Sequence, residues 1–215
     1  MLAQHYKPNT IECGCDEAGR GCLAGPVYAA AVILPAGYAN EKLNDSKQLT
    51  AIKRNHLRHE IEQTATAWAV AAVEPAEIDR LNILHASTHA MCVAVNAICG
   101  NPSPECVAIG GTVPTPLAPQ LLLIDGNRFY NETPIPYECF VKGDGRFMAI
   151  AAASILAKTY RDEHMTQLNI DYPQYGWDRN KGYPTAAHYS AIAQYGTTPF
   201  HRRSFKLDRQ MELSF

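Results

Sequence analysis

The chain has 215 residues, of which 47% are hydrophobic and 19% are charged, and its formal net charge is −2. This length fits one domain, or one domain with an appendage, and the composition allows a core that needs no disulfides or metals. No apolar run reaches the roughly 18 residues of a membrane span, and residues 1–10 lack the apolar segment of a secretory signal. A slightly negative chain is also not expected to coat nucleic acid nonspecifically.

The cysteines favour a reducing compartment. There are seven, without the spacing of a metal finger. Cys13 and Cys15 flank a glycine on a predicted strand and should face the same side, which favours small buried residues over a metal site. We therefore expect a cytoplasmic protein, and nothing in the sequence demands more than a monomer.

The first third of the chain predicts two strands and a helix. Residues 11–15 and 27–34 are apolar and flank a glycine-rich turn, so we expect two strands joined by that turn. Thr50 is a suitable N-cap for a helix that ends near Gln63. The expected apolar stripe of this helix comprises Ile52, Leu57 and Ile61.

The middle of the chain predicts one strand, two helices and a long loop. Residues 66–73 form a short apolar strand, Pro75 opens a turn of helix, and 84–99 form a longer helix. Residues 100–120 contain five prolines and three glycines, which predicts a surface loop.

Two further strands and two helices complete the pattern. The strands are expected over 121–125 and 137–141, and an alanine-rich helix from Phe147 to about Leu168. From Asp171 the chain becomes aromatic and loop-rich, and a helix over 185–195 precedes a basic tail. Strands followed by interleaved helices and strands indicate a layered α/β domain.

Asp16 and Glu17 end the first predicted strand and directly precede Gly19, Arg20 and Gly21. Glycines let the backbone approach a ligand closely. Carboxylates suit a hard metal ion, while backbone amides and an arginine suit a phosphodiester. The stretch therefore indicates hydrolysis of nucleic acid.

Two more acids have alternative explanations when each is taken alone. Asp125 ends an apolar strand and precedes a glycine, so an Asp-Gly turn explains it. Asp144 precedes a predicted helix, where an N-cap explains it.

Six segments together resemble one protein family. Residues 16–21 with the Leu-Ala-Gly-Pro-Val that follows, Asp45–Thr50 and Ile124–Gly126 resemble the first three signature blocks of ribonuclease HII. The remaining blocks are Lys142–Asp144 with Ala151–Lys158 and Arg161–Asp162, then Lys181–Thr185, and finally His201–Phe205. Their order along residues 11 to about 206 makes the resemblance specific.

The resemblance implies a ribonuclease H-like fold, a mixed sheet flanked by helices with a helical C-terminal extension. We expect a catalytic core over residues 1–165 and a C-terminal helical extension and tail over 166–215, which act as one unit. The region from Lys142 onward has ten Lys or Arg against seven Asp or Glu, whereas the residues before it have nine against fourteen. A basic C-terminal surface beside an acidic pocket suits a nuclease.

The resemblance also implies a metal site made of Asp16, Glu17, Asp125 and Asp144, and so favours metal ligation over the turn and the cap. Two Mg²⁺ or Mn²⁺ ions can activate water, stabilise the leaving oxygen and neutralise phosphate charge. Asp16 and Asp125 are expected to be shared ligands, with Glu17 and Asp144 each holding one ion. The implied reaction is hydrolysis of RNA in RNA–DNA hybrids, including single ribonucleotides in duplex DNA, leaving 3′-hydroxyl and 5′-phosphate ends.

Further residues are implied in substrate binding. Gly19, Arg20 and Gly21 would recognise the ribose 2′-OH, and Tyr183 would stack on the deoxyribose that follows it. Candidate phosphate contacts are Lys47, Ser154, Lys158, Arg161, His201, Arg202 and Arg203. Ser154, Lys158 and Arg161 share one helix face, and a solvated face that pairs with Asp162 or Glu163 is an equal alternative for Arg161.

The last six residues have the pattern Gln-x-x-Leu-x-Phe of peptides that dock on replication sliding clamps. Gln210, Leu213 and Phe215 would be the anchors. The alternative is a tail that packs its Leu and Phe on its own domain.

Three other functions are weighed against this one. Ribonuclease HIII shares the core, but its additional N-terminal domain is disfavoured because only ten residues precede the first predicted strand. A nucleotide-binding regulator lacks the Gly-Lys-Ser/Thr of a P-loop and leaves Asp125 and Asp144 unexplained. A catalytically silent, clamp-tethered binder is disfavoured because all four acids are present.

Overall fold

A computed structural model describes residues 2–43, 46, 49–114 and 116–208. Its centre is a six-stranded sheet with the strand order β4-β3-β2-β1-β5-β6. The strands are β1 Glu12–Ala18, β2 Val27–Ile33, β3 Ala67–Val73, β4 Cys106–Gly110, β5 Leu121–Asp125 and β6 Tyr137–Phe140. Strands β1 to β4 pair antiparallel, whereas β5 is parallel to both β1 and β6. The expected mixed sheet is confirmed.

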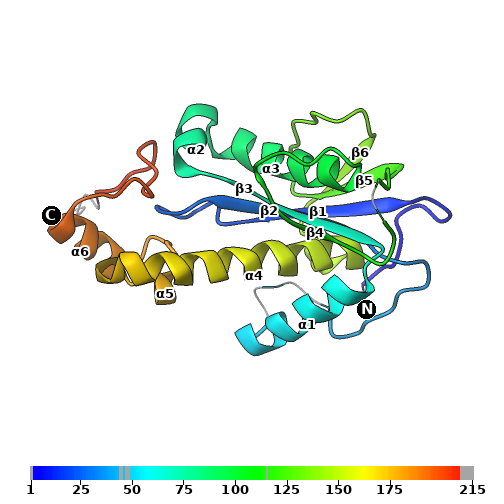
Figure 1. The fold of residues 1–215 in the computed structure, drawn as a ribbon, viewed down its shortest axis with the longest axis horizontal. Helices are drawn as coiled ribbons and strands as arrows, with labels where there is room; N and C mark the ends of the chain where they lie inside the picture. Colours follow the sequence, from blue (N-terminus) through cyan, green and yellow to red (C-terminus); the bar gives the residue numbers. More distant parts are fainter. Residues whose placement is uncertain (1, 44–45, 47–48, 115, 209–215) are drawn as a thin grey trace, which may run out of the picture.

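Helices cover both faces of the sheet. Helices α2 and α3 lie on one face, and α1 and the long α4 lie on the other (Figure 1). The α-helices are α1 Ala51–Thr64, α2 Pro75–Leu81, α3 Ile83–Ile98, α4 Met148–Asp171, α5 Trp177–Asn180 and α6 Ala186–Tyr195, with 3-10 turns η2 Gly143–Gly145 and η3 Pro173–Tyr175.

Small residues in the strands let α4 approach the sheet closely. The buried face of β2 toward α4 includes Ala30, and its opposite face includes Ala29 and Ala31. A Cβ placed on Gly14 would lie 2.2 Å from the backbone carbon of Ala149 in α4. The close contact between β1 and α4 therefore requires glycine at position 14.

Two predictions about local structure are wrong. Residues 100–120 are not a continuous loop, because β4 pairs with β3 at the edge of the sheet and leaves the prolines in the flanking segments. Ile52 does not belong to the buried stripe of α1 and is 84% exposed, because it lies on the solvent side of the first turn. The predicted cap is confirmed, since the Thr50 side chain accepts a hydrogen bond from the Lys53 amide.

The C-terminal helices pack around one end of α4 and lie at the end of the molecule opposite the N-terminus (Figure 1). Helix α4 runs without a break across the predicted division at 165/166, which stays a prediction. Met165 of α4 packs in one cluster with Trp177, Ile192 and Leu23, so the extension contacts the glycine-rich turn between β1 and β2.

All seven cysteines are free thiols, and Cys13 and Cys15 are buried in the cluster on the α3 side of the sheet, as expected. No single described helix has the length and hydropathy needed to cross a membrane. Helices α2 and α3 would pass that test only together, and they meet at a bend of 116°.

Candidate active site

Asp16 and Asp125 lie next to each other on two parallel strands, with Asp16 inside β1 and Asp125 at the end of β5. The register of β1 and β5 pairs Cys15 with Ile124, and one acid follows each of these residues. Strand alternation directs Asp16 to the same face as Gly14, toward α4. Asp125 shares a face with Leu123, which packs on Ile150 of α4. Both carboxylates are therefore directed to the α4 side of the sheet.

Asp144 lies in the η2 turn, beside the end of β5. The amide of Gly143 donates to Asp125 Oδ1 at 2.7 Å, which fixes the turn beside the end of β5. Asp144 is buried within this turn. Glu17 follows Asp16 on β1 and forms an ion pair with Arg20 at 3.2 Å. The four acids of the sequence prediction thus come from adjoining segments.

The electrostatics around Asp16 favour a bound cation. Its pKa lies well above the usual range because the side chain is buried and because Glu17 and Asp125 are also negatively charged. Hydrogen bonds from Ser154 and from the Glu17 amide, the latter at 2.7 Å, oppose this shift. A cluster of like charges in a buried position needs a cation to be stable in its ionised form.

The oxygen ligands of the site suit Mg²⁺ or Mn²⁺. Within the described residues, however, no group of three or more Asp, Glu, His or Cys side chains converges closely enough to hold an ion. The four acids lie on neighbouring segments, but their carboxylates do not converge on one point. The assignment of all four as metal ligands stays a prediction.

Ser154 supports Asp16 instead of lying on an open surface. It is buried in α4, and its Oγ is 2.9 Å from the Oγ of Ser46. Ser46 belongs to the second signature block, so a pair of serines links that block to Asp16. This buried position leaves little surface for the predicted phosphate contact.

The glycine-rich turn exposes its outer surface beside these acids. Gly19 adopts a φ of 96°, in the region that favours glycine, while Arg20 and Gly21 are exposed. Backbone groups of the turn are therefore accessible next to Asp16 and Glu17.

Lys158 and Tyr183 lie together at the edge of this turn. The Lys158 ammonium is 5.7 Å from the centre of the Tyr183 ring and bonds Asp162 at 2.6 Å. Tyr183 is 37% exposed, which leaves part of its ring available for contact.

Four residues predicted to contact phosphate are Arg161, His201, Arg202 and Arg203, and the prediction is wrong for three of them. His201, Arg202 and Arg161 are buried, with exposed fractions of 1%, 0% and 0%. Arg161 is neither an open phosphate contact nor part of a solvated face, because its guanidinium is enclosed by backbone carbonyls. Among these four, Arg203 alone is exposed, and its amide donates to Asp79 of α2.

Sequence reasoning overlooked the structural function of these arginines. The sequence contained a signal for the burial of Arg161, because Ser154, Ala157, Arg161 and Met165 follow a spacing that places them on one face of a helix. The structure shows that all four are buried. Lys47, Gln210, Leu213 and Phe215 lie outside the described residues.

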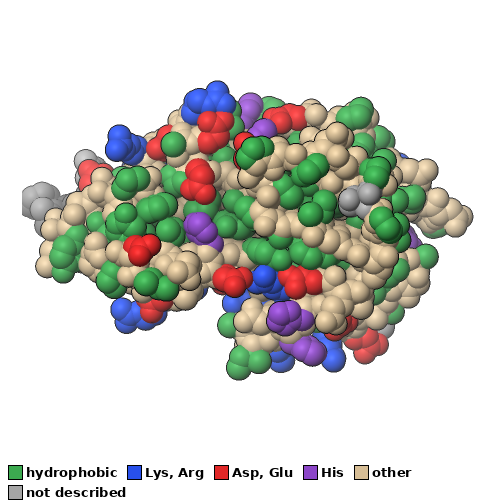
Figure 2. All heavy atoms as spheres, viewed as in Figure 1, with side chains coloured by type: hydrophobic (Ala, Val, Ile, Leu, Met, Phe, Trp, Pro, Cys, Tyr) green, Lys and Arg blue, Asp and Glu red, His purple; other side chains and the backbone are tan. Residues whose placement is uncertain are grey.

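One face of the molecule does not have a continuous basic surface. On the face shown in Figure 2, Lys and Arg side chains are interspersed with Asp and Glu.

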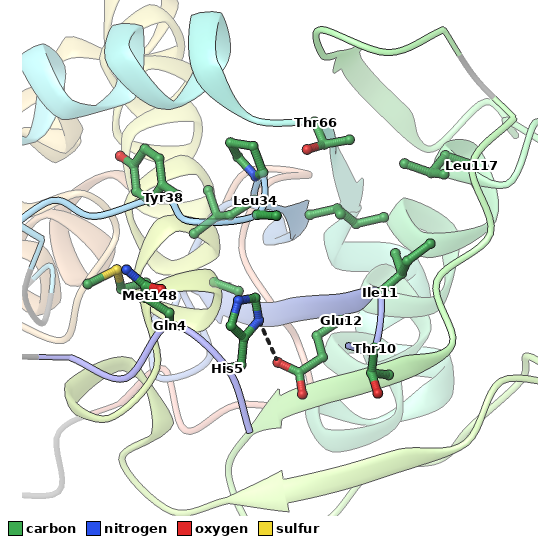
Figure 3. A pocket seen from close by; sticks show the side chains of 14 residues that line it. Gln4, His5, Thr10, Ile11, Glu12, Leu34, Tyr38, Thr66, Leu117 and Met148 are labelled. Carbon is green, nitrogen blue, oxygen red and sulfur yellow. Dashed lines mark ion pairs between the residues drawn. The ribbon is translucent and has the colours of Figure 1, made fainter. Parts of the chain in front are cut away.

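A cavity at the other end of β1 contains none of the four acids (Figure 3). There, Glu12 pairs with His5 and accepts the amides of Tyr6 and Lys7, so it anchors the N-terminal segment.

Comparisons with known proteins cover almost the whole chain. The family model described as Ribonuclease HII matches residues 13–208. Ribonuclease HII of Bacteroides thetaiotaomicron is 54% identical over 217 residues, which cover 100% of both chains.

Solved structures share the fold. Ribonuclease H2 from Pyrococcus horikoshii superposes with a TM-score of 0.70 at 24% identity and covers 91% of this chain and 94% of that one. The RNase HII in a PCNA complex from Archaeoglobus fulgidus superposes with a TM-score of 0.68 at 21% identity, and the match covers 95% of this chain and 100% of that one. On the strength of the full-length relative and the family model, the chain belongs to the ribonuclease HII family.

Proposed function

We propose that this protein is a metal-dependent endonuclease that hydrolyses RNA in RNA–DNA hybrids, including single ribonucleotides embedded in duplex DNA. The observation that carries the proposal is the adjacency of Asp16 and Asp125 beside the glycine-rich turn, where burial and the neighbouring negative charges raise the pKa of Asp16. Membership of the ribonuclease HII family supports the same activity.

Asp16 and Asp125 would hold two Mg²⁺ or Mn²⁺ ions jointly, with Glu17 and Asp144 each holding one. When bound, such ions supply an activated water and neutralise charge on the phosphate and the leaving oxygen. Ser154 orients the Asp16 carboxylate by a hydrogen bond, and the Gly143 amide orients Asp125. These bonds fix both side chains on the α4 side of the sheet before substrate arrives.

The protein itself would select the position of the cut. Backbone groups at Gly19, Arg20 and Gly21, of which Arg20 and Gly21 are exposed, would bind the ribose 2′-OH, which both donates and accepts hydrogen bonds. The partly exposed ring of Tyr183 would stack on the following deoxyribose. Cleavage there would leave 3′-hydroxyl and 5′-phosphate ends.

Positive side chains near the turn would hold the phosphodiester backbone without reading sequence. Lys158, Arg20 and Arg203 are the accessible candidates, and Lys47 is a further one outside the described residues. We propose that the enzyme serves ribonucleotide removal and RNA primer clearance in the cytoplasm, where seven free thiols stay reduced.

Product analysis on a long RNA–DNA hybrid tests the chemistry. We expect internal cuts with Mg²⁺ or Mn²⁺, none with EDTA, and fragments that a polymerase extends without prior phosphatase treatment. Fragments that end in a 3′-phosphate would contradict the 3′-oxygen as the leaving group, and fragments that end in a 2′,3′-cyclic phosphate would show that the ribose 2′-OH, and not a metal-held water, is the nucleophile.

We further propose that Gln210, Leu213 and Phe215 dock on a sliding clamp. A solved structure with the same fold is a complex of PCNA with RNase HII, which supports a clamp as partner. Deleting residues 210–215 should weaken binding to the cognate clamp at least about tenfold without changing hybrid cleavage. Unchanged clamp affinity would rule the docking out.

A further inference from the structure

Arg161 joins two separate segments that both belong to the proposed substrate site. Its Nε donates to the Pro26 carbonyl at 3.0 Å, and its Nη2 donates to the Ala24 carbonyl at 3.1 Å. Its Nη1 donates to the carbonyl of Lys181 at 2.9 Å. One guanidinium thus binds the glycine-rich turn on one side and the loop of Tyr183 on the other.

The contact between the two segments is tight. The Leu23 amide donates to the Gly182 carbonyl at 2.8 Å. A Cβ on Gly182 would lie 2.4 Å from the Ala24 carbonyl oxygen, and a Cβ on Gly19 would lie 2.0 Å from Arg161 Nε. Arg161 therefore packs directly beneath Gly19, and neither segment can shift without changing its contact to the other.

Arg202 holds the remaining side of the turn. Its Nε donates to the Gly25 carbonyl at 2.9 Å, and its Nη1 donates to the Arg20 carbonyl at 3.0 Å. Neither Arg161 nor Arg202 forms an ion pair with a carboxylate in the described part of the chain. Both act through the fixed directions of their guanidinium hydrogen bonds, which lysine cannot reproduce.

We propose that Arg161 is a positioning residue that fixes the distance between the ribose-binding turn and Tyr183, and that it thereby sets the preference for an RNA–DNA junction. The inference rests on the proposed function of these two segments. A single ribonucleotide offers one 2′-OH and one adjacent deoxyribose, so both contacts must be made at the same time. A longer hybrid offers several ribose positions and tolerates a change in their spacing.

Hydrogen exchange tests the coupling independently of activity. In wild-type protein with increasing denaturant, residues 19–26 and 181–183 should exchange with the same opening free energy, because they open as one unit. In Arg161→Lys both segments should exchange at least about tenfold faster. Opening at different denaturant concentrations, or faster exchange in only one segment, would overturn the coupling.

Arg58→Lys is the matched control. Arg58 bonds Glu62 at 2.8 Å and Glu163 at 2.7 Å, so it joins α1 to α4 without touching either segment. This variant should leave exchange in both segments unchanged. The wild-type denaturant series decides the coupling even where Arg161→Lys does not fold.

Kinetics test the consequence for specificity. For Arg161→Lys we expect kcat/KM on an embedded ribonucleotide to fall about 100-fold, and at least about tenfold more than on a long hybrid. Arg58→Lys should keep the wild-type ratio of the two values. An equal loss on both substrates would overturn the role in specificity. Wild-type protein that cleaves neither substrate would instead refute the proposed function, and the exchange data would still decide the coupling.

Discussion

At the scale of single residues, the buried carboxylate of Asp16 lies in an unfavourable electrostatic environment. Burial, which leaves the residue 5% exposed, and the negative charges of Glu17 and Asp125 raise its pKa. Such a group destabilises the protein when ionised without a cation. The proposed metal site therefore lowers the stability of the protein as long as no cation is bound.

Asp16→Asn removes this charge and keeps the shape of the side chain. We expect hybrid cleavage to fall at least about 100-fold. In EDTA the melting temperature of the variant should exceed that of the wild type, because the repulsion is gone. Adding Mg²⁺ should stabilise the wild type more than the variant.

Asp178→Asn is a suitable control, since that acid is on α5 and partly exposed. It should change neither the cleavage rate nor the melting temperature. An Asp16→Asn protein that melts below the wild type in EDTA would contradict the electrostatic account.

Gly19 and Gly21 should respond differently to alanine. Gly19 has a φ of 96° and its Cβ would meet Arg161, whereas a Cβ on Gly21 meets nothing within 4 Å. We expect Gly19→Ala to destabilise the fold by about 1–3 kcal/mol and Gly21→Ala by about 0.5 kcal/mol or less. Denaturant unfolding of both variants measures the difference, and equal losses would refute the role of the turn conformation.

The motifs of the family resemblance singled out the four acids, which residue types alone did not, but they did not reveal the structural function of Arg161 and Arg202. Asp16, Glu17, Asp125 and Asp144 were recognisable from their motifs. Arg161 and Arg202 looked like phosphate contacts, because sequence does not reveal that backbone carbonyls surround them. Their burial depends on segments that are far apart in the chain.

At the scale of elements, the contact between β1 and α4 positions the site. Asp16 is on β1 and its hydrogen-bonded partner Ser154 is on α4, so their distance follows from how these elements pack. Gly14 allows that packing, because a side chain there would meet the α4 backbone.

Gly14→Ala should destabilise the fold by about 3 kcal/mol, because the strand or the helix must move. Chemical unfolding measures the loss, with Gly145→Ala as control, since a Cβ there meets nothing within 4 Å. A loss at position 14 no larger than at position 145 would contradict the packing argument.

Hydrophobic periodicity and caps predicted most helices and strands, as the Thr50 cap illustrates. Strand β4 was missed because its short alternating pattern lies among prolines, and its pairing with β3 is visible only in three dimensions. The exposure of Ile52 likewise depends on where α1 meets its neighbours.

At the scale of the whole molecule, two neutral histidines, His188 and His201, stabilise the C-terminal extension, and His188 also binds the loop of Tyr183. Trp177 donates to His188 Nε2 at 3.1 Å, so His188 Nδ1 carries the proton that binds the Tyr183 carbonyl at 3.0 Å. Burial and neighbouring His188 lower the pKa of His201 to about 4, while its contact with Thr198 opposes the shift. The extension is therefore more stable while both rings are uncharged.

Acid should weaken the fold through His201. The pKa of His201 is lower in the folded protein than in the unfolded chain. Neutral His201 therefore contributes fully to the free energy of unfolding above about pH 6.5, and this contribution is lost as the pH falls toward about 4. We expect up to about 3 kcal/mol of lost stability across this window and a smaller loss in His201→Gln. Unfolding at several pH values tests this, with exposed His59→Gln as control. Parallel pH profiles for wild type and His201→Gln would exclude His201 as the cause.

The family resemblance predicted the architecture of the whole molecule, because six ordered blocks span nearly all of it. The docking of the extension on the turn was not evident from these blocks. It depends on the cluster of Leu23, Met165 and Trp177, which lie far apart in sequence.

The most direct test of the account uses a DNA duplex with one embedded ribonucleotide, incubated with the protein and Mg²⁺ or Mn²⁺. An all-DNA duplex and the Asp16→Asn variant serve as controls. The account predicts one cut immediately 5′ to the ribonucleotide, absent from both controls. Failure to cut this duplex and a long hybrid with either metal would contradict the proposed nuclease.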